Sequence, residues 1–480
     1  MLLQEEGAGF SFGEVIVIEQ MREHWSHHFG FIMAAIGSAI GLGILWKFPY
    51  IVGGNGGGLF LMTYLACVAI IGVPILIAEL ILGRHAQCAA IRAFAHFMPS
   101  HSFWKITGWF GVLASFLIMS FYSVIAGWGM NYVLMSLNGF YQNLDQNQIA
   151  TLFDLLRHSG SLSLFWHLIF TMITVAIVLP GVRRGIEYWA KIMTKTLLVL
   201  LVLLFLYAVT LPGFVPALRF IFLPNIERFT PSSIVEALSL AFWTLSIGQG
   251  IMISYGSYMT PTKSIAHLAG IVSLSVILVA VLSALMIFPV IFTFNLSPSS
   301  GPGLIFQTIP YLFAHLPGSL ILSTLFFILF VFTALTSAIP LVEVVATNLM
   351  ELLGWTRKRS VWVVGCGTAL FGCPSALAKT PFLFPHWKTI YGTDFLTTIN
   401  QFVSIWLIPI GGILTAIFVG WVIDPRILRR EFSLGHSLTW IWRPWHFLIK
   451  WTVPCMIFII MVQTSGIFDF DSLLKFFKKG

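Results

Sequence analysis

The chain is a succession of apolar runs, each long enough to cross a lipid bilayer. A membrane-spanning helix needs about 20 mostly apolar residues, and 58% of this sequence is hydrophobic while only 9% is charged. The runs therefore predict an integral membrane protein with eleven spans. They cover residues 28–51, 59–82, 108–137, 163–181, 187–211, 231–258, 267–294, 317–352, 360–378, 395–423 and 445–467.

Two of these runs are interrupted by glycine at matching places. Residues 37–43 (GSAIGLG) interrupt the first run, and residues 244–250 (TLSIGQG) interrupt the sixth. Bilayer hydrocarbon holds no water to satisfy a broken helix, so unwound backbone is tolerated there where it lines a cavity or is buried in protein. Isolated glycines also let helices pack closely, but paired interruptions in two halves of a chain are typical of a transporter's binding site. We therefore expect a substrate site where the two breaks meet.

The two interruptions also predict how the chain is organised. Spans one to five (28–211) and spans six to ten (231–423) are equal in number, and each set opens with a broken helix, as in two inverted-topology repeats. The span at 445–467 is then an additional helix. The predicted fold is an all-α membrane protein forming one integral domain over residues 1–480, with an N-terminal gate segment at 1–27, two inverted five-helix repeats, and broken helices 1 and 6.

Basic residues fall mainly in one set of alternate loops, which the positive-inside rule assigns to the cytoplasm. These residues are Arg22, Arg84, Arg92, Lys105, Arg183, Arg184, Lys263, Arg357, Lys358, Arg359, Arg426, Arg429, Arg430 and Arg443. The N-terminus is therefore expected in the cytoplasm and, with eleven spans, the C-terminus outside. The net charge of +8 reflects these loops, so it favours the lipid bilayer and not nucleic acid as the charged partner. The intramembrane ionisable residues are too scattered for an enzyme, and they form no rings of like charge for a channel.

Short motifs follow one another along nearly the whole chain. They are REHW at 22–25, GSAIGLG at 37–43, KFP at 47–49, NGGG at 55–58, PILIAE at 74–79, GR at 83–84, SFY at 120–122, GIE at 185–187, TLSIGQG at 244–250, IFP at 287–289, GPG at 301–303 and TS at 336–337. In sequence and order they closely resemble the neurotransmitter:sodium symporter family, in its eleven-span bacterial branch. The resemblance implies a bacterial inner-membrane transporter that moves an amino acid by alternating access, and no enzyme. A sodium-independent exchanger and an amino-acid-sensing receptor on the same scaffold remain alternatives, and a homodimer is also compatible with the family.

Broken helices supply the groups that an amino acid zwitterion needs, namely donors for its carboxylate and acceptors for its ammonium. Backbone N–H groups after Leu42 and Gly43 point a positive helix end at the carboxylate, and Tyr122 can add a hydroxyl unless it is a purely structural tyrosine. The ammonium would be held by the carbonyls of Ala39, Trp243 and Thr244 with the Ser246 hydroxyl. By resemblance, these are the family's substrate positions.

Other substrate positions, also carried over by resemblance, surround the side chain of the substrate. They are Ile118, Trp243, Gln249, Ser337 and Leu341. Gln249 is unusual, because relatives that carry plain apolar amino acids have an apolar residue there and a buried amide needs partners. It suggests a medium-sized or aromatic substrate side chain with a polar tip.

The resemblance implies two sodium sites, and this chain keeps the ligands of the second one. Those ligands are the carbonyls of Gly37, Ile40 and Thr333 and the hydroxyls of Thr336 and Ser337. At the first site the family's two asparagines align with Ile44 and Ser275. A hard cation needs oxygen ligands, so we expect Na⁺ at one site only. The chloride-linked position aligns with Val279, which cannot bind an anion, and no chloride is expected.

Lys195 makes the coupling ion uncertain. The family usually has a proline ten residues after the glycine that aligns with Gly185, whereas this chain has Lys195 there, roughly 15 Å into the helix. An intramembrane lysine is a functional candidate by default. Three interpretations remain open: a cation that replaces sodium and leads to proton coupling or exchange, a gating element beside an intact sodium site, or a structural lysine that snorkels or pairs with a carboxylate.

Two gates can also be transferred from the family. The cytoplasmic gate would consist of Arg22, Trp25, Ser257, Tyr258 and Glu351. At the outer gate, the family's arginine–aspartate pair aligns with Lys47 and Asn400, with Asp394 as a nearby alternative partner. A lysine facing an amide is a weaker latch than a bidentate arginine pair. A simple interfacial position is the alternative for each charged gate residue.

Overall fold

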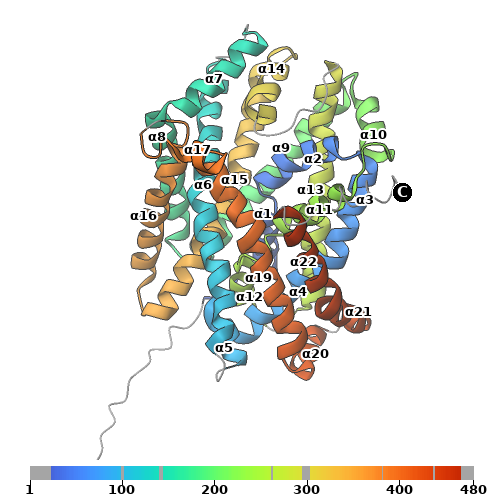
Figure 1. The fold of residues 1–480 in the computed structure, drawn as a ribbon, viewed down its shortest axis with the longest axis vertical. Helices are drawn as coiled ribbons and strands as arrows, with labels where there is room; N and C mark the ends of the chain where they lie inside the picture. The colour runs from blue at the N-terminus through green and yellow to red at the C-terminus, as the bar shows by residue number, and fades with distance from the viewer. Residues whose placement is uncertain are drawn as a thin grey trace, which may run out of the picture.

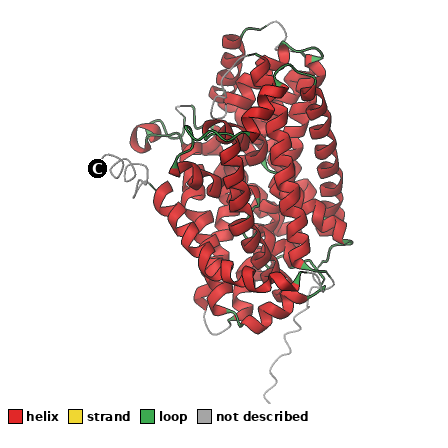
Figure 2. Ribbon diagram, turned by 90° about the vertical axis from the view of Figure 1, so that its right-hand side faces the viewer, coloured by secondary structure: helices red, strands yellow, loops and turns green. Residues whose placement is uncertain are grey.

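The protein is a bundle of helices of different lengths that run roughly along its long axis (Figure 1). The computed structural model describes residues 23–98, 102–139, 144–260, 263–294, 303–380, 382–435 and 438–465. Those residues form helices and connecting loops and contain no β-strand (Figure 2). The predicted all-α membrane fold is confirmed.

The first five predicted spans correspond to continuous or segmented helices. In chain order they are α1 (His28–Ala39) with η1 (Gly43–Lys47) and α2 (Phe48–Gly54); α3 (Gly58–Cys67) with η2 (Val68–Gly72) and α4 (Val73–Ala86); α6 (Lys105–Leu137); α8 (Gly160–Val178); and η4 (Val182–Glu187) with α9 (Tyr188–Val209). The segments η1, η2 and η4 are short stretches of π-helix.

The other six predicted spans follow the same pattern. They are α11 (Pro231–Thr244) with α12 (Ile251–Gly256); α13 (Ile265–Thr293); α15 (Ser319–Leu353); α16 (Arg357–Ala376); α18 (Phe395–Phe402) with η6 (Val403–Leu407), α19 (Ile408–Ile417) and η7 (Phe418–Val422); and η8 (Thr439–Ile441) with α21 (Trp442–Phe447), η9 (Leu448–Thr452) and α22 (Val453–Thr464). Short helices connect the spans: α5 (Ala90–Phe97), η3 (Ser102–Trp104), α7 (Gln146–His158), α10 (Phe214–Phe222), η5 (Leu304–Thr308), α14 (Ile309–Ala314), α17 (Trp387–Tyr391) and α20 (Pro425–Ser433).

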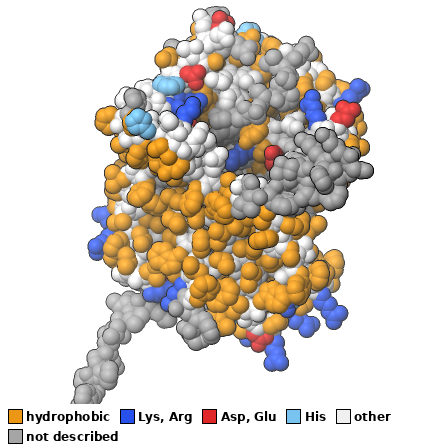
Figure 3. Space-filling view, viewed as in Figure 1, with side chains coloured by type: hydrophobic (Ala, Val, Ile, Leu, Met, Phe, Trp, Pro, Cys, Tyr) orange, Lys and Arg blue, Asp and Glu red, His pale blue; other side chains and the backbone are white. Residues whose placement is uncertain are grey.

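Within the described residues, eight helices are each long and apolar enough to cross a membrane, and the bent pair of α1 with η1 and α2 raises this to nine. The two remaining predicted spans fall outside that test for local reasons. The pair α11 and α12 is split into halves of 14 and 6 residues. The helix α16 has 20 residues but begins with the basic triplet Arg357–Arg359. On the face seen in Figure 3, hydrophobic side chains form a broad band, and Lys and Arg lie mainly above and below it.

Both glycine-rich segments break their helices. After Ala39 the chain bends by 52° before it continues through η1 and α2. Between α11 and α12, Ser246, Gly248 and Gly250 adopt positive φ angles of 51°, 75° and 71°. Glycine tolerates such angles because it lacks a Cβ, whereas Ser246 needs support from its surroundings. The breaks therefore free backbone N–H and C=O groups in the middle of the bundle.

The broken helices are enclosed by the long ones. The first half-helix, α1, packs against α9, α13 and α15, and α6 packs against α8, α15 and α16. The helices α6 and α15 are 33 and 35 residues long. They run through the centre of the view in Figure 1. This scaffold fixes the position of the breaks relative to each other.

Candidate substrate and ion sites

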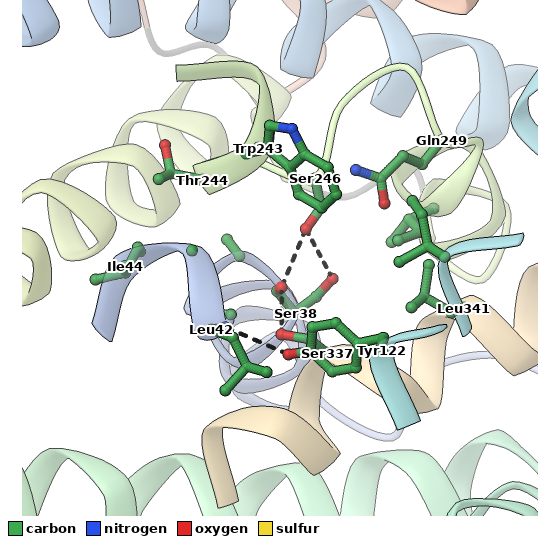
Figure 4. A pocket seen from close by; sticks show the side chains of 15 residues that line it. Ser38, Leu42, Ile44, Tyr122, Trp243, Thr244, Ser246, Gln249, Ser337 and Leu341 are labelled. Carbon is green, nitrogen blue, oxygen red and sulfur yellow. Dashed lines mark hydrogen bonds between the residues drawn. The ribbon is translucent and has the colours of Figure 1, made fainter. Parts of the chain in front are cut away.

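A cavity lies where the two helix breaks meet α6 and α15 (Figure 4). Including the space at its open side, it measures about 410 Å³. The residues that line it are Ser38, Ala39, Gly41, Leu42, Gly43, Ile44, Ile118, Tyr122, Trp243, Thr244, Ser246, Gln249, Ile251, Ser337 and Leu341. All eleven residues predicted for the substrate are among them. The lining residues that were not predicted are Ser38, Gly41, Ile44 and Ile251. Each lies in or beside a glycine-rich segment, so its position in the sequence could have identified it as cavity lining.

One end of the cavity presents hydrogen-bond donors. The Leu42 N–H, at the start of the second half of the first span, donates to the Tyr122 hydroxyl oxygen over 3.3 Å. Tyr122 is 7% exposed and comes from α6. A backbone N–H at a helix start and an adjacent hydroxyl are suited to an anionic group such as a carboxylate.

Three serine side chains join the two breaks to α15. The Ser246 hydroxyl donates to the Ser38 carbonyl over 3.0 Å, and the Ser337 hydroxyl donates to the same carbonyl over 3.0 Å. The Ser38 hydroxyl donates in turn to Ser246 Oγ over 3.4 Å. The bonds made by Ser246 support its left-handed backbone, and Figure 4 shows the cluster on the cavity wall.

Glu79 stabilises the second break from outside the cavity. It is fully buried on α4, and its Oε1 accepts a hydrogen bond of 2.7 Å from the Gly248 N–H. Because the N–H groups of a broken helix have no helical partner, this carboxyl satisfies one of them. Glu79 therefore supports the second helix break.

Four of the five residues predicted for the second sodium site, namely Gly37, Thr333, Thr336 and Ser337, lie together where α1 packs on α15. The amides that would normally bond the Gly37 and Ser38 carbonyls are used elsewhere: the Gly41 N–H bonds the Ala39 carbonyl, and the Leu42 N–H bonds Tyr122. The Ser337 hydroxyl lies 3.5 Å from the Gly37 carbonyl oxygen.

The α15 side of this site is equally rich in oxygen. The hydroxyl of Thr336 donates to the Thr333 carbonyl over 3.0 Å. A Cβ atom placed on Gly37 would lie 3.1 Å from the Cβ of Thr336, so α15 and the α1 break are in close contact. Ile40, the remaining predicted ligand, is fully buried. Carbonyl and hydroxyl oxygens freed at a break are the donors that a hard cation prefers, and this donor set fits sodium.

Around the positions that align with the first sodium site, few oxygen atoms are available. Ile44 is fully buried and lines the cavity, while Ser275 is half-buried on α13. The Thr244 hydroxyl is 2.9 Å from the Tyr64 hydroxyl, so it is already in a hydrogen bond. Val279, at the chloride-linked position, is 1% exposed and offers no donor.

Lys195 does not face the second sodium site. Its side chain is exposed, and its Nζ lies 5.3 Å from the centre of the Phe29 ring at the start of α1. The residue of α9 that faces Gly37 is the fully buried Thr194, whose hydroxyl donates to the Met33 carbonyl over 3.0 Å. Successive residues of a helix point about 100° apart, so Thr194 and Lys195 cannot face the same point. This geometry does not favour a lysine that replaces sodium, and the gating element and the structural lysine stay as the other two interpretations.

Two residues of the predicted cytoplasmic gate, Trp25 and Tyr258, are in direct contact. Trp25 is 8% exposed; its backbone N–H bonds the Tyr258 carbonyl over 3.1 Å, and its indole N–H bonds the Tyr255 carbonyl over 3.1 Å. Ser257 is buried at the end of α12. Both oxygens of Glu351 accept the Ala89 N–H, at 2.8 and 2.9 Å, so this carboxylate is bound to the start of α5. Arg22 lies outside the described residues.

The predicted outer pair is not formed. The Lys47 Nζ lies 4.4 Å from the centre of the Trp243 ring, so it makes a cation–π contact with a residue that lines the cavity. The Asn400 side-chain oxygen accepts a hydrogen bond from Ser404 instead, over 3.3 Å. The alternative partner, Asp394, forms an ion pair of 2.7 Å with Lys379. At the predicted outer gate, Lys47 therefore contacts the ring of Trp243 and neither Asn400 nor Asp394.

A buried ion pair behind the cytoplasmic gate was missed by the sequence analysis. Glu343 on α15 has a fully buried side chain, and its Oε2 accepts from Arg357 Nη2 over 2.6 Å. The Tyr258 hydroxyl donates to Glu343 Oε1 over 2.6 Å. A carboxylate inside an apolar run is a functional candidate by default, so Glu343 could have been found from the sequence, although its partners could not.

Comparison with known proteins agrees with this architecture. The model of the sodium:neurotransmitter symporter family matches residues 22–148 and 140–475. An uncharacterized sodium-dependent transporter of Bacillus subtilis, YhdH, is 36% identical over 94% of this chain and 100% of its own length, and one of Haemophilus influenzae is 31% identical over 92% and 98%. The crystal structure of MhsT in complex with L-phenylalanine is similar, with a TM-score of 0.84, 36% identity, and coverage of 92% of this chain and 100% of that one. The broken helices, the central cavity and these matches place the chain in the sodium:neurotransmitter symporter family.

Proposed function

We propose that this protein is a secondary transporter that carries an amino acid across the bacterial inner membrane by alternating access. The observation that carries the proposal is the cavity at the two helix breaks, which has a backbone N–H and a hydroxyl at one end and freed carbonyls with hydroxyls beside them. This arrangement matches the two charges of an amino acid zwitterion. The L-phenylalanine named for the MhsT complex supports the same class of substrate.

The proposed coupling ion is sodium at the second site, between the α1 break and α15. The donor set of Gly37, Ile40, Thr333, Thr336 and Ser337 supports it, as do the sodium-dependent relatives. Bound there, the cation would hold the α1 break against α15, because its ligands come from both elements. The exposed position of Lys195 argues against an amine that replaces the cation. The apolar Ile44 argues against a second sodium, and Val279 against chloride.

In the proposed cycle the two gates open in turn. With the cytoplasmic gate closed by Trp25 and Tyr258, the cavity is reached from the outer side once Lys47 and Trp243 separate. Binding of substrate and sodium then allows the outer side to close and the contacts of Trp25 to break. The N-terminus is proposed to be cytoplasmic and the C-terminus outside.

Uptake by reconstituted protein tests the proposal. A pool of labelled amino acids would be offered to proteoliposomes under an inward sodium gradient, an inward proton gradient, and neither. We expect accumulation that requires sodium and does not respond to removal of chloride. Uptake driven by protons or by exchange alone would contradict the coupling ion, and binding without accumulation would indicate a receptor. Failure to bind or transport any amino acid would refute the substrate class.

A further inference from the structure

Gln249 places a polar group without a partner on the apolar side of the cavity. It is 4% exposed and lines the cavity, and among the described residues its side-chain amide makes no hydrogen bond. Figure 4 shows this amide on the cavity side, across from Trp243 and Ser246. Because this amide borders the open space of the cavity, its hydrogen-bonding groups are available to a molecule that enters there.

The backbone of Gln249 is held against α6, so its side chain starts from a fixed point on the cavity wall. Its carbonyl accepts a hydrogen bond of 2.8 Å from the Ser115 hydroxyl on α6. The next residue, Gly250, has a φ of 71°, and a side chain on Gly111 of α6 would lie 2.9 Å from the Gly250 nitrogen. The two glycines thus permit a close approach of α6 to the break, and this approach aims Gln249 inward.

The surroundings of the amide are apolar and aromatic. Ile118, Ile251 and Leu341 line the same cavity, and they are 2%, 1% and 3% exposed. The Trp243 ring, which carries the Lys47 amine on one side, lines it as well. An aromatic substrate ring packs well against aliphatic and aromatic groups, but such walls cannot satisfy an amide. A ring with a hydrogen-bonding group at its far end satisfies both requirements.

We propose that Gln249 selects amino acids whose aromatic side chain ends in a hydrogen-bonding group, with the phenolic hydroxyl of tyrosine as the simplest case. This inference rests on the proposed function. A phenolic hydroxyl both donates and accepts, so it can bond either end of the amide. A site built to bond a substrate hydroxyl rejects the analogue that lacks it, because its own buried polar group is then left unpaired.

The test compares L-tyrosine with L-phenylalanine, which differ by this one hydroxyl. Purified protein would be titrated with each, and affinity would be read from competition against a labelled amino acid and from thermal stabilisation by ligand. We expect wild-type protein to bind tyrosine roughly tenfold to a hundredfold more tightly than phenylalanine. In Gln249→Met, which is apolar and of similar length, the preference should fall to about threefold or less, while phenylalanine still binds.

Leu341→Met is the matched control, because it alters the same cavity without touching a polar group. It is expected to change both affinities in the same direction and to leave their ratio near that of the wild type. If Gln249→Met does not fold, the proposal can still be tested on wild-type protein. Its affinity for tyrosine and phenylalanine would be compared with that for O-methyl-L-tyrosine, whose ether oxygen accepts a hydrogen bond but cannot donate one. Equal or tighter binding of phenylalanine by the wild type would overturn the selection by Gln249 and leave amino acid transport standing. Binding of no amino acid would refute the proposed function itself.

Discussion

We predict that Glu343 and Arg357 stabilise the protein as a buried pair, and not as two independent charges. The Glu343 side chain is fully buried and the Arg357 side chain is 18% exposed. Two hydrogen bonds of 3.1 and 2.6 Å join them, and Tyr258 adds a third to the same carboxylate. In Glu343→Leu, the guanidinium would keep the Val178 carbonyl as its hydrogen-bond acceptor among the described residues, with the Glu23 carboxylate as the remaining negative charge that acts on it.

The expected magnitude follows from the stranded charge. Removing one partner of a buried ion pair costs about 3–5 kcal/mol, whereas replacing both by apolar residues of similar volume is often close to neutral. Glu343→Leu and Arg357→Met should therefore each destabilise the protein by about 3–5 kcal/mol. The double variant should cost only about 1–3 kcal/mol, because it strands no charge but still loses the hydrogen bond from Tyr258. Tyr258→Phe removes one hydrogen bond to a charge and should cost about 1.5–3 kcal/mol.

Thermal unfolding of the purified variants in detergent measures this order. The two single variants should have the lowest melting temperatures, Tyr258→Phe an intermediate one, and the double variant should recover toward the wild type. A double variant as unstable as the sum of the two single changes would refute the reasoning, since the charges would then act independently. Uptake by the double variant would then distinguish an effect on stability from an effect on gating. This variant has no unpaired buried charge, but it also lacks the hydrogen bond between Tyr258 and Glu343.

Three further outcomes are expected. Lys195→Met should leave the sodium dependence of uptake unchanged, because the amine lies over Phe29 and not at the ion site; loss of sodium dependence or a new proton dependence would contradict this. Thr336→Ala should raise the sodium concentration for half-maximal uptake by about tenfold or more, while Thr336→Ser, which keeps the hydroxyl, should stay close to the wild type. Burial alone would raise the pKa of the Asp394 carboxyl, but hydrogen bonds from Lys379 and Thr397 and the Lys379 charge hold this pKa below its usual value. A depressed pKa gives stability that is present above the unfolded-state pKa, near 4, and is lost as the pH falls through the folded-state pKa. The melting temperature of the wild type should accordingly fall more steeply below about pH 4 than that of Asp394→Asn, and parallel pH profiles of the two proteins would contradict the contribution of this ion pair.

The spans and their breaks could be predicted from the sequence because they depend on local properties. The length and apolarity of a run decide whether it can cross a bilayer, and the glycines around Ile40 and Ser246 decide where a helix can unwind. Several residues within these breaks were therefore expected at the substrate site without a structure, whereas Ser38 and Gly41 of the first break were not. Positions farther away, such as Tyr122 and Leu341, came from the family resemblance.

The rotation of each helix about its own axis and the choice of its neighbours were decided by tertiary packing alone. An apolar run hydrophobic on all sides carries no signal for which face meets a neighbour. The sequence therefore could not tell that Thr194 faces the ion site and Lys195 faces away from it. For the same reason it did not reveal that Lys47 lies on Trp243. Such pairs join residues far apart in the chain, and only the packed bundle brings them within contact distance.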